Sequence, residues 1–95
     1  MHRIVVAYAL TPWLILAGMP AIAQTVSVTG VLTNEGVECP AMRGEDGELY
    51  TLNPRTLLGG FKPGDRLRVT GTIQEISFCQ QGITIGIESI VAVEP

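Results

Sequence analysis

Two cysteines, Cys39 and Cys79, are the most reactive side chains in the sequence. A cysteine nucleophile needs a nearby base, but the one histidine is His2, and Glu38 beside Cys39 favours the protonated thiol. A redox pair typically has Cys-x-x-Cys spacing, and structural zinc sites usually take four Cys or His ligands. The sequence favours a structural disulfide, and it leaves free redox thiols, or a metal site completed by Glu38 or Glu45, as alternatives.

Other groups of residues give weaker indications of a functional site. The acidic segment 45–48 lacks the spacing of a calcium-binding loop, and its carboxylates are typical of a solvated hairpin tip. No glycine-rich phosphate loop is present, and one tyrosine among scattered carboxylates assembles no catalytic group after the first 23 residues. We therefore expect a protein that is not an enzyme, with no cofactor and no bound metal.

The first 23 residues have the pattern of an export signal. A short basic start leads into an apolar run from Ile4 to Met19, and Ala21 and Ala23 fit a cleavage site before Gln24. A retained anchor is the alternative, since the apolar stretch is just long enough to span a bilayer. The sequence predicts cleavage between Ala23 and Gln24, a mature domain of residues 24–95, a periplasmic or secreted location, and no membrane contact after cleavage.

The mature chain is small and acidic. Of the six basic residues, Arg3 lies in the signal segment, whereas all nine acidic residues follow it. This balance disfavours polyanions, so no nucleic acid partner is expected. A domain of this size buries only about 60% of its unfolded surface, so a cross-link matters. In an exported chain an even cysteine count favours a disulfide, which would stabilise the fold by about 4 kcal/mol.

Turn residues recur every eight to twelve positions, which is typical of a small all-β domain. Apolar alternation predicts strands at residues 25–33, about 37–42, 48–52, 66–78 and 83–93, with a helical turn at 54–58. The apolar parity of the fourth strand changes after Ile73, which predicts a bulge near Gln74 and Glu75. In the fifth strand the odd positions are apolar, which predicts one buried face.

Three strands, a short helix and two strands follow the order of an OB-fold, a small five-stranded barrel. Gly30 and Gly71 suit its strongly bent strands. An SH3-like barrel is the alternative. In the OB-like layout Cys39 lies on the second strand and Cys79 near the end of the fourth. Phe61 and Phe78 are expected in the core or as plugs of the barrel ends.

One group of side chains suits ligand binding. OB-folds bind ligands on the face of strands two and three and in adjoining loops, where an aromatic ring stacks and cations hold anionic groups. The predicted ligand-binding residues are Arg43, Tyr50, Arg66 and Arg68. The alternation of Arg66 and Arg68 with Leu67 and Val69 is also explained by an outer strand face alone.

Three segments, GVLTNEGVECPAMRGEDGELYTL, GFKPGDRLRVTGTI and ISFCQQGITI, resemble an uncharacterised family of short exported bacterial proteins, a domain of unknown function. The resemblance covers nearly all of residues 26–92 and implies no reaction. We expect an exported, non-catalytic binding module with one disulfide, whose ligand is a peptide, a saccharide or an envelope protein. The alternative is a small thiol-redox or metal-binding periplasmic protein that uses Cys39 and Cys79.

Overall fold

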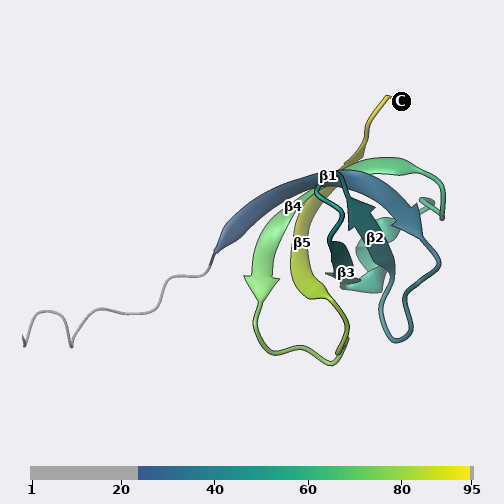
Figure 1. The fold of residues 1–95 in the computed structure, drawn as a ribbon. Helices are drawn as coiled ribbons and strands as arrows, with labels where there is room; N and C mark the ends of the chain where they lie inside the picture. Colours follow the sequence, from purple (N-terminus) through teal and green to yellow (C-terminus); the bar gives the residue numbers. More distant parts are fainter. Residues whose placement is uncertain (1–23, 95) are drawn as a thin grey trace, which may run out of the picture.

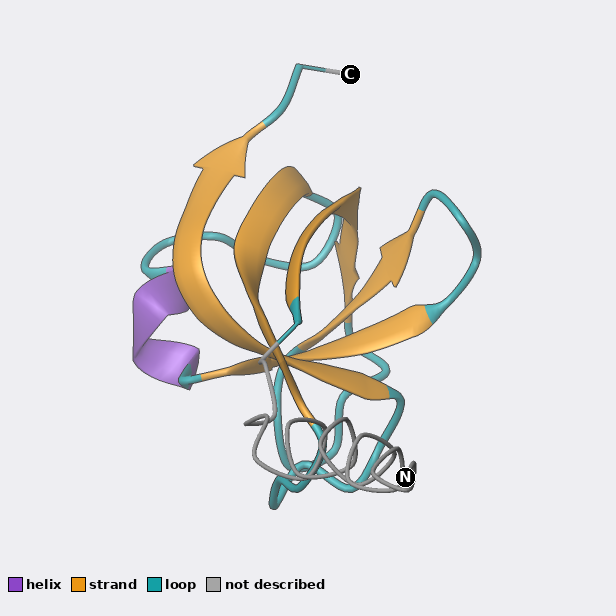
Figure 2. Ribbon diagram, turned by 90° about the vertical axis from the view of Figure 1, so that its left-hand side faces the viewer, coloured by secondary structure: helices purple, strands orange, loops and turns teal. Residues whose placement is uncertain are grey.

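Five strands form a closed barrel in the computed structural model, which describes residues 24–94 (Figures 1 and 2). The elements are β1 (Thr25–Thr33), β2 (Ala41–Gly44), β3 (Leu49–Asn53), the 3₁₀ helix η1 (Arg55–Leu58), β4 (Arg66–Gln74) and β5 (Ile83–Ala92). Around the barrel the order is β1-β2-β3-β5-β4, with β3 and β5 parallel and the other pairs antiparallel. This arrangement confirms the predicted all-β, OB-like barrel.

The predicted signal segment and its cleavage site between Ala23 and Gln24 lie outside the described residues. Within residues 24–94, no helix is long and apolar enough to cross a bilayer.

Strand β1 organises the barrel because it pairs with two neighbours. It pairs with β4 from Thr25 to Val31 and with β2 from Gly30 to Thr33. At Gly30 the neighbouring backbone comes so close that a Cβ atom would collide with the carbonyl of Arg43. The two strand partners can close on β1 only because this position has no side chain.

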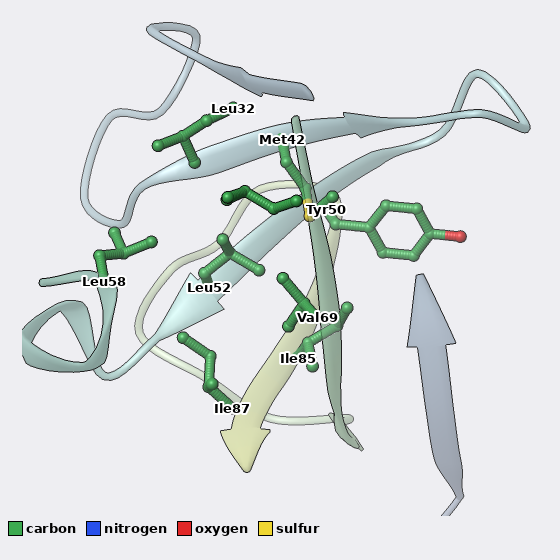
Figure 3. Close-up of a cluster of buried hydrophobic side chains, with 9 residues drawn as sticks. Leu32, Met42, Tyr50, Leu52, Leu58, Val69, Ile85 and Ile87 are labelled. Carbon is green, nitrogen blue, oxygen red and sulfur yellow. The ribbon is translucent and has the colours of Figure 1, made fainter. Parts of the chain in front are cut away.

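The core is filled by alternate residues of all five strands (Figure 3). Leu67 and Val69 of β4 are buried, as is Ile85 of β5, and from the other side Met42 and Leu52 are fully buried. Leu58 of η1 packs against the same cluster, and Phe61 covers it as a partly buried side chain. The helical turn therefore caps one part of the core, and Phe61 packs as expected.

Strand β4 is shorter than predicted. It ends at Gln74, so Gln74 and Glu75 form no bulge, and residues 75–82 form a loop. Ile76 and Phe78 are exposed, and the prediction that Phe78 is a core or barrel-end side chain is wrong. The chain leaves the barrel here because Cys79 is bonded to a distant loop rather than paired with a strand.

The register irregularity lies elsewhere, between Thr70 and Gly71 of β4. Gly71 pairs with Ile87 and Thr70 pairs with Ser89, so β5 has one additional residue at this point. The extra residue reverses the side-chain parity of β5. Ile90 packs against the core whereas Val91 is exposed, which corrects the prediction that odd positions stay buried to the end of the strand.

Candidate functional site

A disulfide joins the two long loops of the barrel. Cys39 lies in the loop of residues 34–40, between β1 and β2, and Cys79 lies in the loop of residues 75–82, between β4 and β5. Their Cα atoms are 5.3 Å apart, and both residues are buried. The predicted disulfide is confirmed, although both cysteines lie in loops and neither lies on a strand. We call these two segments the loop pair.

The amide of Gln81 fastens the loop pair a second time. The backbone N–H of Val37 donates to Gln81 Oε1 at 3.1 Å, and Gln81 Nε2 donates to the carbonyl of Glu35 at 2.9 Å. One side chain thus supplies both an acceptor and a donor to the opposite loop. The two loops are held by covalent and polar contacts at once.

A chain of hydroxyl groups anchors the 75–82 loop onto the outer face of β3 and β5. Thr51 of β3 lies opposite Thr84 of β5, and their Oγ1 atoms are 2.8 Å apart. Thr51 Oγ1 donates its one hydrogen to the carbonyl of Gln81, so the hydroxyl of Thr84 must donate to Thr51. The hydroxyl of Ser77, whose Oγ lies 2.9 Å from Thr84 Oγ1, must then donate to Thr84. The N–H of Cys79 in turn donates to Ser77 Oγ at 3.2 Å.

The outer face predicted for ligand binding is therefore covered by the protein itself. Thr51 faces outward because its neighbours Tyr50 and Leu52 point into the core, yet Thr51 is buried. Thr84 is also buried, and so is Ala41, which pairs with Thr51 from β2. The 75–82 loop covers these residues from outside. A ligand on this part of the β2–β3 face would have to displace a fully hydrogen-bonded loop.

Arg43 is fixed by acceptors within its own domain. Its Nε and Nη2 donate to the two carboxylate oxygens of Glu35 at 3.1 and 2.9 Å, and Nη1 donates to the carbonyl of Gly47 at 3.0 Å. The guanidinium group, followed by the hydroxyl of Thr33, lowers the pKa of Glu35, and Glu35 raises the pKa of Arg43. Arg43 therefore joins the 34–40 loop to the hairpin turn after β2.

The two arginines of β4 lie on the same outer surface. Arg43 and Arg66 both pair with Val31, from opposite sides of β1, so these positions form a row across β2, β1 and β4. Arg66 forms an ion pair with Glu45, and exposed Arg68 donates from Nε to Thr29 Oγ1 at 3.3 Å. The structure brings the three predicted arginines together, but two of them are occupied by carboxylates.

Tyr50 lies apart from this row. Its side chain belongs to the core cluster, with its hydroxyl pointing away from the other labelled side chains in Figure 3. The residue is only 8% exposed, and its hydroxyl donates to Asp46 Oδ2 at 2.7 Å. This hydrogen bond, with burial, raises the pKa of Tyr50 to about 12 and lowers the pKa of Asp46. The ring therefore offers no open face for stacking.

The Tyr50 hydroxyl is expected to ionise near pH 12 rather than near 10. In the form that begins at Gln24 it is the sole tyrosine, so phenolate absorbance reports it alone. Asp46→Asn should return the midpoint toward 10, because it removes the negative acceptor, whereas Glu88→Gln on β5 should leave it unchanged. Since the folded pKa is raised, the stabilisation is complete below pH 10 and is lost as the pH rises toward 12. An unshifted midpoint in the wild type would contradict the hydrogen bond.

Among residues 24–94, the most exposed large apolar side chains lie on the loop pair. The sequence pattern did not indicate them as functional residues. Val37 is 78% exposed, Ile76 93% and Phe78 61%. Ile76 and Phe78 continue the apolar pattern of β4, which is why they were assigned to a longer strand. The signal that could have separated them is the adjacent Cys79, because a disulfide to residue 39 draws this segment off the barrel.

A shallow hollow of about 380 Å³ adjoins the loop pair on the side of η1. Val37, Pro40 and Phe61 are among the residues that line it, and Arg55 at its edge donates to the carbonyl of Glu38 at 2.9 Å. Among the described residues, no three His, Cys, Asp or Glu side chains are grouped closely enough to hold a metal ion.

Comparison with protein families gives one match. The model of the family described as "Protein of unknown function (DUF5818)" matches residues 29–93, which include nearly the whole barrel. Neither the curated proteins nor the solved structures contain a match to this chain.

Proposed function

The chain belongs to the family of proteins of unknown function DUF5818, and from that premise we propose that it is a non-catalytic interaction module that binds a protein partner through the loop pair. The observation that carries the proposal is the exposure of Val37, Ile76 and Phe78 on two loops that are otherwise tightly fixed. Large apolar side chains that are exposed on loops of a small domain are typical of interaction sites.

The energetics favour binding at this place. Burial of one large aliphatic or aromatic side chain contributes about 1.5–3 kcal/mol. Binding loops usually lose conformational entropy when they bind, which reduces affinity. Here the disulfide, the Gln81 amide and the hydroxyl chain through Thr51 already order the loops in the free protein. Most of the apolar contact energy is thus available to the complex.

The surrounding charges indicate the chemistry of the partner. Glu38 and Glu75 are exposed on the same two loops, and neither forms an ion pair with any residue from 24 to 94. A partner surface with an apolar pocket and flanking Lys or Arg side chains would complement both features. A folded envelope protein or an apolar peptide segment fits this description better than a saccharide, which is bound mainly through its hydroxyl groups.

The proposal includes a periplasmic or secreted location and a role for the cysteines that is structural rather than chemical. A disulfide is compatible with a periplasmic or extracellular compartment, which agrees with the predicted export. The thiol-redox and metal alternatives would need the two sulfur atoms, and both are held in a buried disulfide. Poor access slows thiol exchange, and a disulfide offers no thiolate, which is the form of cysteine that binds metals.

The double variant Ile76→Ser and Phe78→Ser tests the proposal. The exported protein, immobilised, should retain specific envelope proteins, and the double variant should retain them at least tenfold less, which corresponds to about 1.4 kcal/mol. The matched control is Leu57→Ser on η1, an exposed apolar residue outside the loop pair. Captured proteins are quantified by mass spectrometry.

Two results would contradict this function. Equal capture by the wild type and the double variant would remove the loop pair from binding, and an equal loss with Leu57→Ser would indicate nonspecific adsorption. Because all three side chains are exposed, unfolding temperatures should stay close to that of the wild type. A thermal shift with soluble glycans that disappears in the double variant would assign the site to a saccharide instead.

A further inference from the structure

A second unpartnered surface is the open edge along the first half of β1. Strand β2 pairs with β1 only from Gly30 onward, whereas β4 pairs with it from Thr25. From Thr25 to Thr29, β1 has no second neighbouring strand among the described residues. In Figure 1 the start of β1 lies at the left, beside β4 and away from β2.

The directions of the free backbone groups follow from two hydrogen bonds. The carbonyl of Thr29 accepts from the N–H of Glu45, just after β2, so the backbone groups of Thr29 face away from β4. The carbonyl of Gln24 accepts from Ile73 of β4 and faces the other way. Since residues two apart share a direction, the N–H and C=O groups of Thr25 and Ser27 point to the open edge.

The strand itself lacks the features that normally prevent strand addition, and the neighbouring acidic residues are Glu45 and Asp46 at the Thr29 end. From Gln24 to Val31 there is no charged residue and no proline, and the β-branched content is high. Beside the edge lies a hollow of about 420 Å³, whose lining includes Val26, Val28, Tyr50 and Ile83. A strand added here would gain backbone hydrogen bonds and a place for its inward side chains.

The sequence of the edge points to one occupant. Thr25-Val26-Ser27-Val28-Thr29 reads the same in both directions. We propose that a second copy of this chain adds its own β1 antiparallel to this edge, in a two-fold symmetric dimer centred on Ser27. In this register Ser27 meets Ser27 of the partner subunit, and Val26 meets Val28 of the partner subunit, with both valines directed at the hollow, whose lining also includes the polar side chains of Gln74 and Glu75.

Charge and symmetry favour this occupant over an unrelated peptide. The paired segments are neutral, so two acidic chains can meet here without placing like charges opposite each other. A two-fold interface uses the same surface on both subunits, and the palindromic strand meets this condition at residues 26–28, since the carbonyl of Thr29 already accepts from Glu45. Glu75 and Gly82 of the 75–82 loop line the hollow, whereas Val37, Ile76 and Phe78 do not, so the dimer leaves these three apolar side chains available to the partner proposed above.

Charge swapping at Ser27 tests the dimer. Sedimentation of the exported protein, its N-terminus established by intact mass, should show a dimer at concentrations up to about 1 mM, the weak limit of specific association. Ser27→Lys alone and Ser27→Glu alone should each be monomeric, because like charges face each other at the two-fold axis. An equal mixture of the two variants should restore a one-to-one dimer.

The control is Ser89→Lys, an exposed residue on β5, which should leave the dimer intact. Restoration in the mixture also proves that the two Ser27 variants are folded. The proposal is overturned if the wild type is monomeric throughout the series, or if Ser27→Lys alone stays dimeric. It is equally overturned if the mixture stays monomeric, or if a monomer binds a free valine-rich peptide at this edge, which would assign the edge to another occupant.

Discussion

Replacement of both cysteines, Cys39→Ala with Cys79→Ala, is expected to lower the free energy of unfolding by about 4 kcal/mol. The disulfide closes a loop between residues 40 positions apart, which removes many conformations from the unfolded chain. Small domains have total stabilities of about 5–15 kcal/mol, and this one lies at the small end of domain size. The loss should show as a lower midpoint in urea denaturation followed by far-ultraviolet circular dichroism.

The double alanine variant is the informative form because it leaves no unpaired thiol. The wild type with reductant in the urea series should lose a similar amount, and intact mass after alkylation identifies the bonded state of each sample. A loss below about 1 kcal/mol would show that the Gln81 and Thr51 hydrogen bonds hold the folded loops without help from the disulfide, and it would contradict the structural role. In this variant the two loops would become ordered only when they bind the partner. The entropy lost in that step should lower the affinity of the loop pair for the partner.

The second large effect is expected at Gly71 of β4. Gly71→Ala should destabilise the barrel by about 3 kcal/mol, at the upper end of the overpacking range. A Cβ atom there would collide with the carbonyl of Gly86 on β5 and would also crowd the side chain of Ile85. Neither backbone can yield easily, because Gly71 adjoins the register shift that curves both strands. Thermal and urea unfolding measure the loss.

Gly60→Ala is the matched control. It lies outside the strands, its φ is not in the left-handed region, and no atom lies within 4 Å of the position of its Cβ. The substitution reduces the freedom of the unfolded chain and should stabilise the protein by about 0.4–1 kcal/mol. If Gly71→Ala were as well tolerated as Gly60→Ala, the close approach of β4 and β5 would be wrong.

The two proposed surfaces use different parts of the barrel. The loop pair joins the β1–β2 and β4–β5 loops, whereas the dimer edge is the first half of β1. Their tests are therefore separable: Ile76→Ser with Phe78→Ser should leave the dimer intact, and Ser27→Lys should leave partner capture intact. A symmetric dimer would present two loop pairs, which raises avidity for a partner with repeated sites.

Local sequence pattern predicted what depends on local chemistry. The alternation in TVSVTGVLT predicts the full range of β1, and turn residues separate all five strands and the helical turn in the OB order. The pairing of Cys39 with Cys79 follows from an even count in a chain that is predicted to be exported, without knowledge of distance. Arg66 and Arg68 lie on an outer strand face, as their alternation with Leu67 and Val69 indicates.

The tertiary structure decided what depends on contacts between distant residues. Ile76 and Phe78 have the pattern of a buried strand, yet the disulfide to Cys39 places their segment in an exposed loop. Arg43 and Arg66 look free in the sequence, but folding brings Glu35 and Glu45 to them. Tyr50 looks like a stacking surface, but the barrel turns it inward and Asp46 accepts its hydroxyl hydrogen.

The physical reason for this division is that periodicity records only which side of a strand a residue faces. What covers that side is set by strand register and loop closure, which join residues far apart in the chain. The sequence by itself determined the order of the strands in the barrel and the pairing of the two cysteines, but not the ends of β2 and β4. Only the tertiary structure decided that residues 75–82 cover part of the expected ligand face, that Ile76 and Phe78 are exposed, and that β2 pairs with β1 only from Gly30 onward.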